Sequence, residues 1–478
     1  MVTESAQSEG TQQLQTRKTE SQQASQQPKS WSTNWAWLFA GCLLLLIANL
    51  VRSWPVFTHP GFYVEDAALF SRYYGNGLPV TDIWAYLFGQ PYKMVITNFL
   101  AWCIGHLDVR VHLQVYLWTG FAWGTTAACC FFFTGLIRSR SVLLLGPLLI
   151  GLSGMNHIFY YNTLIFVMYS CLAVLLILFF FPAPKSIFNA LPLFVLCLFL
   201  PWAGPYSAVA VPISLFMLLL FWQDLNRTKR FLLLTSGLSA FLYYLTVQGG
   251  TSTIMRLKRV SVIQTYLDSI LDRIFYFDLF GYVPPWFWIP ILLIIGGSFL
   301  LFRKDTVFIK NSLLMLATIF GSFTLFYLSS KYPVYIRPKP CHMFLSAFFW
   351  CVYLLYLVDH LFQRYGEQKI PVTIFLVLLC TVIFFDNKKH KDKNTVSPLT
   401  GTDAYIAAIH AMEQQDLKKK NQYVILRHQT SQHHVMHPWV QVGSRQADAQ
   451  QLFPDDLPAQ LQSEFVSSSE ERRPETLK

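Results

Sequence analysis

The chain has 478 residues, of which 53% are hydrophobic, 16% aromatic and only 13% charged. Soluble globular proteins carry about 25% charged residues, so most of this protein's surface does not face water. The net charge of +11 does not indicate a nucleic-acid partner, because the cations lie mainly in short loops between apolar runs, where membrane topology places them. The composition predicts an all-α membrane protein: a polytopic helical bundle.

Residues 1–34 are rich in Gln, Ser and Thr, a composition that cannot bury a core and predicts a disordered tail. The apolar run that follows, Trp35 to Val51, comes late and has no small-residue cleavage site after it. We therefore expect a retained first helix with a cytoplasmic amino terminus.

A helix that crosses a membrane needs about 20 mostly apolar residues. Eleven candidates for such helices follow one another at about 35–52, 113–135, 141–155, 163–182, 187–202, 206–222, 231–247, 285–302, 311–329, 342–362 and 370–386. The apolar stretch 83–104 is broken by Gly89, Pro91 and Lys93, which favours a helix that lies at the interface or re-enters the membrane. Residues 35–386 are thus predicted to form the transmembrane domain, with a helix count good to one or two.

Basic residues occupy every second loop if the amino terminus is cytoplasmic. These are Arg138 and Arg140; Lys185; Arg227, Lys229 and Arg230; Arg303 and Lys304; and Arg364 and Lys369. The longer loops, 52–112 and 248–284, then lie outside, as does the tail 387–478. The basic run 388–393 fits the outside poorly, and one miscounted helix would reverse the side of the tail.

The tail itself is expected to be a small α/β appendage. Residues 402–418 have the pattern of an amphipathic helix, and Tyr423–Leu426 and Trp439–Val442 have that of two short strands. The last 25 or so residues are polar, and we expect no structure there.

Paired acids mark the segment Pro60 to Leu78, PGFYVEDAALFSRYYGNGL, in the first outside loop. Glu65 and Asp66 lie there among aromatic residues. A carboxylate in this setting can act as a general base, or its oxygens can hold a divalent metal. The alternative is a helix start at which two acids meet the helix dipole.

A second candidate segment, KYPVYIRPKPCH, spans Lys331 to His342. Arg337 sits between Pro333 and Pro338, with Lys339 beside it, on the side where cations are not favoured. A guanidinium can bind a phosphate through two parallel hydrogen bonds. The alternative is a solvated basic loop.

Other outside turns offer weaker candidates. His157 lies in Met155 to Asn162, and the Gly- and Pro-containing turn Trp202 to Ser207 joins two further helices, so both turns could line a cavity. In loop 248–284, Arg256 leads a basic cluster that could meet lipid phosphate. The sequence shows no Cys/His metal spacing, Walker A loop, GxGxxG after a strand or GxSxG elbow.

A first outside loop that carries paired acids, VEDAALF, followed by many helices and a later outside YIRPKP segment resembles the GT-C superfamily of membrane glycosyltransferases. These enzymes use polyprenyl-phosphate sugars at the periplasmic or lumenal face. The resemblance implies that Asp66 is the catalytic base or metal-linked residue, with Glu65 as its neighbour, and that Arg337 lies in the donor-phosphate region.

The function expected from these features is transfer of a sugar from a polyprenyl-phosphate donor to a lipid or polysaccharide at the outer face of a bacterial inner membrane. Asp66 would take the proton of the acceptor hydroxyl, and Arg337, with Lys339 or Arg256, would hold the donor phosphate. Two alternatives remain. A transporter or flippase would show internal repeats and charges inside helices, and a membrane scaffold would leave the acids and Arg337 scattered.

Overall fold

The structure is a computed structural model. It describes residues 35–58, 61–62, 94–152, 164–179, 187–246, 266–267, 270, 286, 288–329, 344–365, 400–401, 422–426, 439–442 and 463–466. These residues contain eleven α-helices: α2 (Trp35–Thr58), α5 (Val95–Gly105), α6 (Val109–Cys130), α7 (Arg140–Leu152), α8 (Leu164–Phe179), α9 (Ile187–Phe199), α10 (Ala210–Phe221), α11 (Arg227–Thr246), α14 (Trp288–Leu301), α15 (Thr306–Ser329) and α16 (Phe344–Tyr365). Short 3-10 helices add η2 (Phe131–Thr134), η4 (Leu200–Ala203), η5 (Pro205–Val209) and η6 (Trp222–Asp224).

The predicted helical architecture is confirmed over the described part of the chain. Ten of the eleven apolar runs coincide with described helices, and the eleventh, 370–386, lies outside the described residues. Within the described ranges, three helical segments are long and apolar enough to cross a membrane: Tyr206–Asp224, Thr306–Thr324 and Phe344–Tyr365. Eleven crossings therefore stay a prediction. α2 runs to Thr58, six residues past the predicted end, because apolar and aromatic residues continue beyond Arg52.

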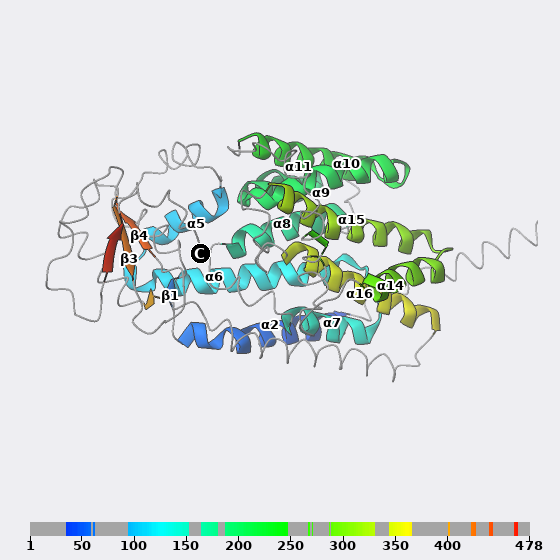
Figure 1. The fold of residues 1–478 in the computed structure, drawn as a ribbon, viewed down its shortest axis with the longest axis horizontal. Coiled ribbons are helices and arrows are strands. Elements are labelled where there is room, and N and C mark those ends of the chain that lie inside the picture. The colour runs from blue at the N-terminus through cyan, green and yellow to red at the C-terminus, as the bar shows by residue number, and fades with distance from the viewer. Residues whose placement is uncertain are drawn as a thin grey trace, which may run out of the picture.

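Two pairs of neighbouring helices run in opposite directions. α2 and α6 are antiparallel, as two contacts show. Phe57 stacks on Trp118 at a centroid distance of 4.3 Å, and Asn49, earlier in α2, donates to Thr125, later in α6, at 3.3 Å. α15 and α16 form a second antiparallel pair. Ser322 and Ser346 share a hydrogen bond of 2.7 Å, and Asn311 donates to the Tyr356 hydroxyl at 3.0 Å. The long helices lie side by side in Figure 1.

Two glycines allow α2 and α7 to approach each other closely. A Cβ at Gly41 would lie 2.0 Å from the Leu143 carbonyl oxygen, and one at Gly151 would lie 2.9 Å from a Leu45 methyl carbon. Apolar helices in a membrane gain little from burying apolar surface, so close backbone contact through small residues is their main source of attraction. The α2–α7 contact therefore depends on these glycines.

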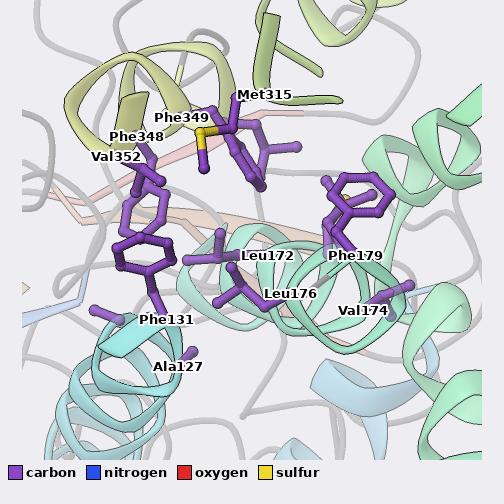
Figure 2. Close-up of a cluster of buried hydrophobic side chains, with 14 of the residues drawn as sticks. Ala127, Phe131, Leu172, Val174, Leu176, Phe179, Met315, Phe348, Phe349 and Val352 are labelled. Carbon is purple, nitrogen blue, oxygen red and sulfur yellow. The ribbon is translucent and has the colours of Figure 1, made fainter. Parts of the chain in front are cut away.

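The core lies between η2, α8, α15 and α16. In Figure 2 the side chains of Phe131, Leu172, Leu176 and Phe349 point toward shared space, and Met315 approaches from α15. All five side chains are fully buried. Each such side chain gains many weak dispersion contacts, which together hold the helices in register.

Large apolar side chains also cover the outer surfaces of α2, α9, α10, α11 and α14. Phe188 is 88% exposed, Leu219 80% and Leu300 73%. Single exposed apolar residues are ordinary, but whole helix faces of this kind need apolar surroundings. The pattern is what a bundle surrounded by lipid requires.

Five strands complete the described structure. β1 (Gly61–Phe62) pairs with β2 (Thr400–Gly401), and β3 (Gln422–Leu426) lies between β4 (Trp439–Val442) and β5 (Ser463–Val466), with all pairs antiparallel. β3 and β4 coincide with the two strands expected in the tail. β5 corrects the expectation that the last 25 residues have no structure, because the apolar pair Phe465 and Val466 extends the sheet by one strand. The predicted helix 402–418 lies outside the described residues.

Three described connections, η2–α7, α10–α11 and α14–α15, meet the end of α16 at one end of the bundle, which we call the basic end. The cations of the basic end are Arg138, Arg140, Arg227, Lys229, Arg230, Arg303, Lys304, Lys310 and Arg364. Lys310 pairs with Asp224, Arg364 donates to the Leu301 carbonyl, and Lys229 donates from Nζ to the Ile177 carbonyl at 2.8 Å. The alternating basic loops read from the sequence thus converge in space. Lys185 and Lys369 lie outside the described residues.

The buried carboxylate of Asp359 joins two helices at this end. Its Oδ1 accepts hydrogen bonds from the backbone N–H groups of Arg138 at 3.1 Å and Ser139 at 2.6 Å, immediately before α7. Gln363 donates to Oδ2 at 2.5 Å. The first N–H groups of a helix have no partner within it, and an acid placed there also meets the positive end of the helix dipole. Asp359 therefore caps α7 from α16, 220 positions later in the chain.

We predict that Asp359→Ala lowers the free energy of unfolding by about 2 kcal/mol, because two N–H groups lose their acceptor in a buried place. Asp359→Asn keeps an acceptor oxygen and should cost less. Asp224→Ala, which removes an exposed ion pair at the same end, should cost less than about 1 kcal/mol. Thermal unfolding of the detergent-purified variants measures the order, and equal effects of Asp359→Ala and Asp224→Ala would contradict the capping role.

Candidate functional site

The six residues that the sequence proposes for the site lie outside the described residues. They are Asp66, Glu65, Arg337, Lys339, Arg256 and His157. Their convergence on one cleft therefore stays a prediction. The structure does describe the helix ends from which these segments leave, and these ends set the frame of the candidate site.

Those helix ends lie opposite the basic end, at what we call the loop end. The loop end comprises Thr58, Leu152, Leu164, Thr246, Ser329 and Phe344, where α2, α7, α11 and α15 finish and α8 and α16 start. Tyr169 and Phe344 contact each other at a centroid distance of 4.8 Å. This contact brings together the starts of two helices, α8 and α16, that follow His157 and Arg337 by seven residues each.

The first loop and the tail meet through backbone pairing. Phe62 pairs with Thr400 and Gly61 with Gly401 in antiparallel register. β1 comes three residues after α2 ends and three before Glu65. α16, by contrast, finishes at the basic end at Tyr365, so the chain returns to the loop end between Tyr365 and Thr400. The predicted eleventh helix, 370–386, falls in this interval.

Helix α5 packs at the loop end against α6, α8 and η4. Its eleven residues rise by about 16 Å, far short of a bilayer's hydrocarbon thickness of about 30 Å. One face is buried, with Thr97, Asn98 and Ala101 inward. The helix thus has the length expected of an interfacial or re-entrant segment. It covers the second half of the predicted stretch 83–104, and residues 83–93 lie outside the described residues. Asp108 caps the following helix by accepting from the Arg110 N–H at 2.8 Å.

The turn Trp202 to Ser207 is packed into the bundle instead of opening a cavity. Its 3-10 helices η4 and η5 meet at Gly204, where a Cβ would lie 2.3 Å from a Val167 methyl carbon of α8. Trp202 donates from Nε1 to Ser239 Oγ at 3.1 Å, and Ser239 donates on to the Leu198 carbonyl at 2.6 Å. Gly204 and Trp202 therefore pack between helices and do not line a cavity, in contrast to the expectation.

Three hydroxyl groups at this level are buried without a hydrogen-bond partner among the described residues: Thr97, Ser170 and Ser207. Ser170 precedes Cys171, whose thiol donates to the Tyr206 carbonyl at 3.3 Å, next to Ser207. Buried hydroxyls normally have a partner, which for many is an ordered water or a ligand. The sequence does not single these hydroxyls out, because a Ser or Thr within an apolar run looks like an ordinary helix residue.

Charge is absent from the middle of the described helices. Every Asp, Glu, Lys or Arg in them lies within two turns of a helix end. The polar side chains between these charged ends pair with neutral groups. Thr318, near the middle of α15, donates to the Leu314 carbonyl at 2.8 Å, and Tyr353, near the middle of α16, shares a hydrogen bond of 2.6 Å with Ser298. Across the described ranges, no cluster of three His, Cys, Asp or Glu side chains is arranged to hold a metal ion.

Comparison with known protein families finds no matching family, and comparison with curated proteins finds no similar sequence. The functional assignment therefore depends on the chain's own residues.

We predict that a Phe62→Cys, Thr400→Cys double variant forms a disulfide on mild oxidation, because cross-strand partners have Cβ atoms about 4.5–5.5 Å apart. Phe62→Cys with Arg364→Cys, at the basic end, should not. Mass spectrometry of the linked peptides distinguishes the new bond from those of the nine natural cysteines. Equal linkage in both pairs would contradict the placement of the tail beside the first loop.

Proposed function

We propose that the protein is a polytopic membrane glycosyltransferase that moves a sugar from a polyprenyl-phosphate donor to a lipid or polysaccharide acceptor at its loop end. One observation carries the proposal: the bundle has a strongly basic end, and the helix ends that flank Asp66, His157 and Arg337 all lie opposite it. Basic loops favour the cytoplasmic side. In a bacterium, the loop end would then face the periplasm across the inner membrane, with eleven crossings and the amino terminus inside.

Asp66 would act as the general base in this reaction. Its carboxylate takes the proton from the acceptor hydroxyl while that oxygen bonds to the anomeric carbon of the sugar, and the bond from this carbon to the phosphate oxygen breaks. Glu65 would support its neighbour. Carboxylate oxygens also suit a divalent metal, which would help to neutralise the leaving phosphate.

Arg337 would bind the donor phosphate as it leaves, with Lys339 or Arg256 nearby and His157 facing the substrate. A guanidinium offers two parallel N–H donors that match two phosphate oxygens. Pro333 and Pro338 restrict the segment's backbone, so binding would cost it little conformational entropy. The polyprenyl chain would stay in the bilayer, which explains why a soluble domain would not suffice.

The neutral middle of the described helices favours transfer over transport. A transporter for an anionic solute would place charges or broken helices at matching depths in two halves. The described helices carry no charged side chain in their middle, and the two prolines that lie beyond the first and last turns of these helices, Pro147 and Pro192, both belong to the first half of the chain. The scaffold alternative is addressed by the variants below.

We predict that Asp66→Asn abolishes sugar transfer without changing expression or unfolding temperature, since loss of a general base costs roughly 10²–10⁴-fold. Glu65→Gln should cost less. Transfer is measured with purified protein and a polyprenyl-phosphate sugar. Full activity of Asp66→Asn would remove this mechanism.

For Arg337 we predict a graded loss of activity: Arg337→Lys impaired and Arg337→Ala nearly inactive, because lysine keeps the charge but loses the two-point contact. A rise in KM would place the contact in the bound donor, and a fall in kcat would place it in the transition state. An arginine that only anchors a loop to head groups would tolerate lysine, so equal activity of all three proteins would favour a scaffold.

A further inference from the structure

Three cations meet at one corner of the basic end, where the turn between α14 and α15 lies against the end of α16. Arg303 and Lys304 are exposed in the turn. The Arg364 guanidinium is held over the rings of Phe302 and Tyr365, 5.5 Å from each centroid, and it donates to the Leu301 carbonyl. Planar contacts of this kind hold a guanidinium in place while leaving N–H groups free to bind.

The carboxylate nearest to this corner is already engaged. Asp305 Oδ1 accepts from the Val307 and Phe308 N–H groups at 3.1 and 2.9 Å, and Oδ2 faces His360 Nε2 at 3.8 Å. The other described carboxylates of the basic end are engaged as well, Asp224 with Lys310 and Asp359 with the start of α7. The described part of the basic end holds nine cations and three carboxylates, which give it a formal net charge of +6. The corner is therefore set to attract an anion.

A notch in the outer face of α14 leads away from these cations. Leu293 and Leu300 lie two turns apart on one face of the helix, and both are highly exposed. Gly296 and Gly297 lie between them, and a Cβ at either glycine would meet no described atom within 4 Å. Glycine is unfavourable inside a helix, and here no packing contact with the described residues requires it. This face of α14 therefore has a gap at the two glycines with a leucine on either side of it, and all of these residues are apolar.

We propose that this corner binds one anionic phospholipid, with its phosphate held by Arg303, Lys304 and Arg364 and an acyl chain lying in the glycine notch of α14. The inference rests on the proposed membrane-spanning bundle and not on the transfer reaction. A free phosphate ion would use the cations alone, whereas the apolar notch that begins one turn below them fits a ligand with a chain. Exposed Val307 provides a second apolar surface beside the turn.

Native mass spectrometry of the detergent-purified full chain tests the proposal, with phosphatidylglycerol and phosphatidylcholine of identical chains as the two probes. The wild type should bind phosphatidylglycerol more tightly. The double substitution Arg303→Gln, Lys304→Gln should weaken the binding of phosphatidylglycerol about 25-fold, since each cation near a lipid surface raises the affinity about fivefold. The matched control, Arg140→Gln with Arg227→Gln, removes the same charge from exposed positions elsewhere on the basic end and should have little effect.

The glycine variants separate the chain from the head group. Gly296→Leu with Gly297→Leu should weaken binding of both lipids while the preference for phosphatidylglycerol persists. Equal losses in the two charge variants would show diffuse attraction and overturn the site, as would displacement of phosphatidylglycerol by inorganic phosphate at the same concentration. Lipid binding is measured without a sugar donor. The Asp66→Asn protein, which we expect to be inactive in sugar transfer, should therefore still bind the lipid. Failure of transfer and failure of lipid binding are thus distinguishable.

Discussion

The arrangement of this protein follows from the cost of placing charge in an apolar medium. A charged side chain in the middle of a bilayer costs several kcal/mol, so charges collect where the helices end. Every charged residue of the described helices obeys this limit. The few that are buried, such as Asp359 and Lys229, satisfy the backbone groups that helix ends leave without partners. One constraint thus creates both the neutral interior and the charged ends.

Two unlike ends result, and the proposed transfer reaction would take place at only one of them. The short basic connections hold their helices close together through Asp359, Lys229 and Arg364. The longer segments that carry the candidate acids and Arg337 leave from the other end. The proposed chemistry on a lipid-linked substrate would need such a division, because the helices would position the lipid chain while the longer loops would enclose the polar head group. The buried hydroxyls of Thr97, Ser170 and Ser207 provide polar groups just below that level.

Inside the bundle, close packing of complementary helix surfaces holds the helices together, as the hydrophobic effect does for proteins in water. Gly41 and Gly151 bring α2 onto α7, and Gly204 brings the 3-10 turn onto α8. Dispersion contacts are short-ranged, so a single methyl group at such a place would separate two helices. The glycines of α14 differ, since described neighbours leave the space above them open. The same residue type therefore serves helix packing at one place and can form a binding surface at another.

The sequence alone determined the helices and their alternation, because a run of about 20 apolar residues and the side of its flanking cations are local properties. It also indicated β3 and β4, which are short runs rich in β-branched and aromatic residues. It proposed Glu65, Asp66 and Arg337 from residue type and neighbours, but composition does not show which segments share an end. Only the tertiary structure decided that β1 pairs with β2, that β5 joins the sheet and that Asp359 caps α7. Each of these links residues at least 37 positions apart, and no local pattern records the partner.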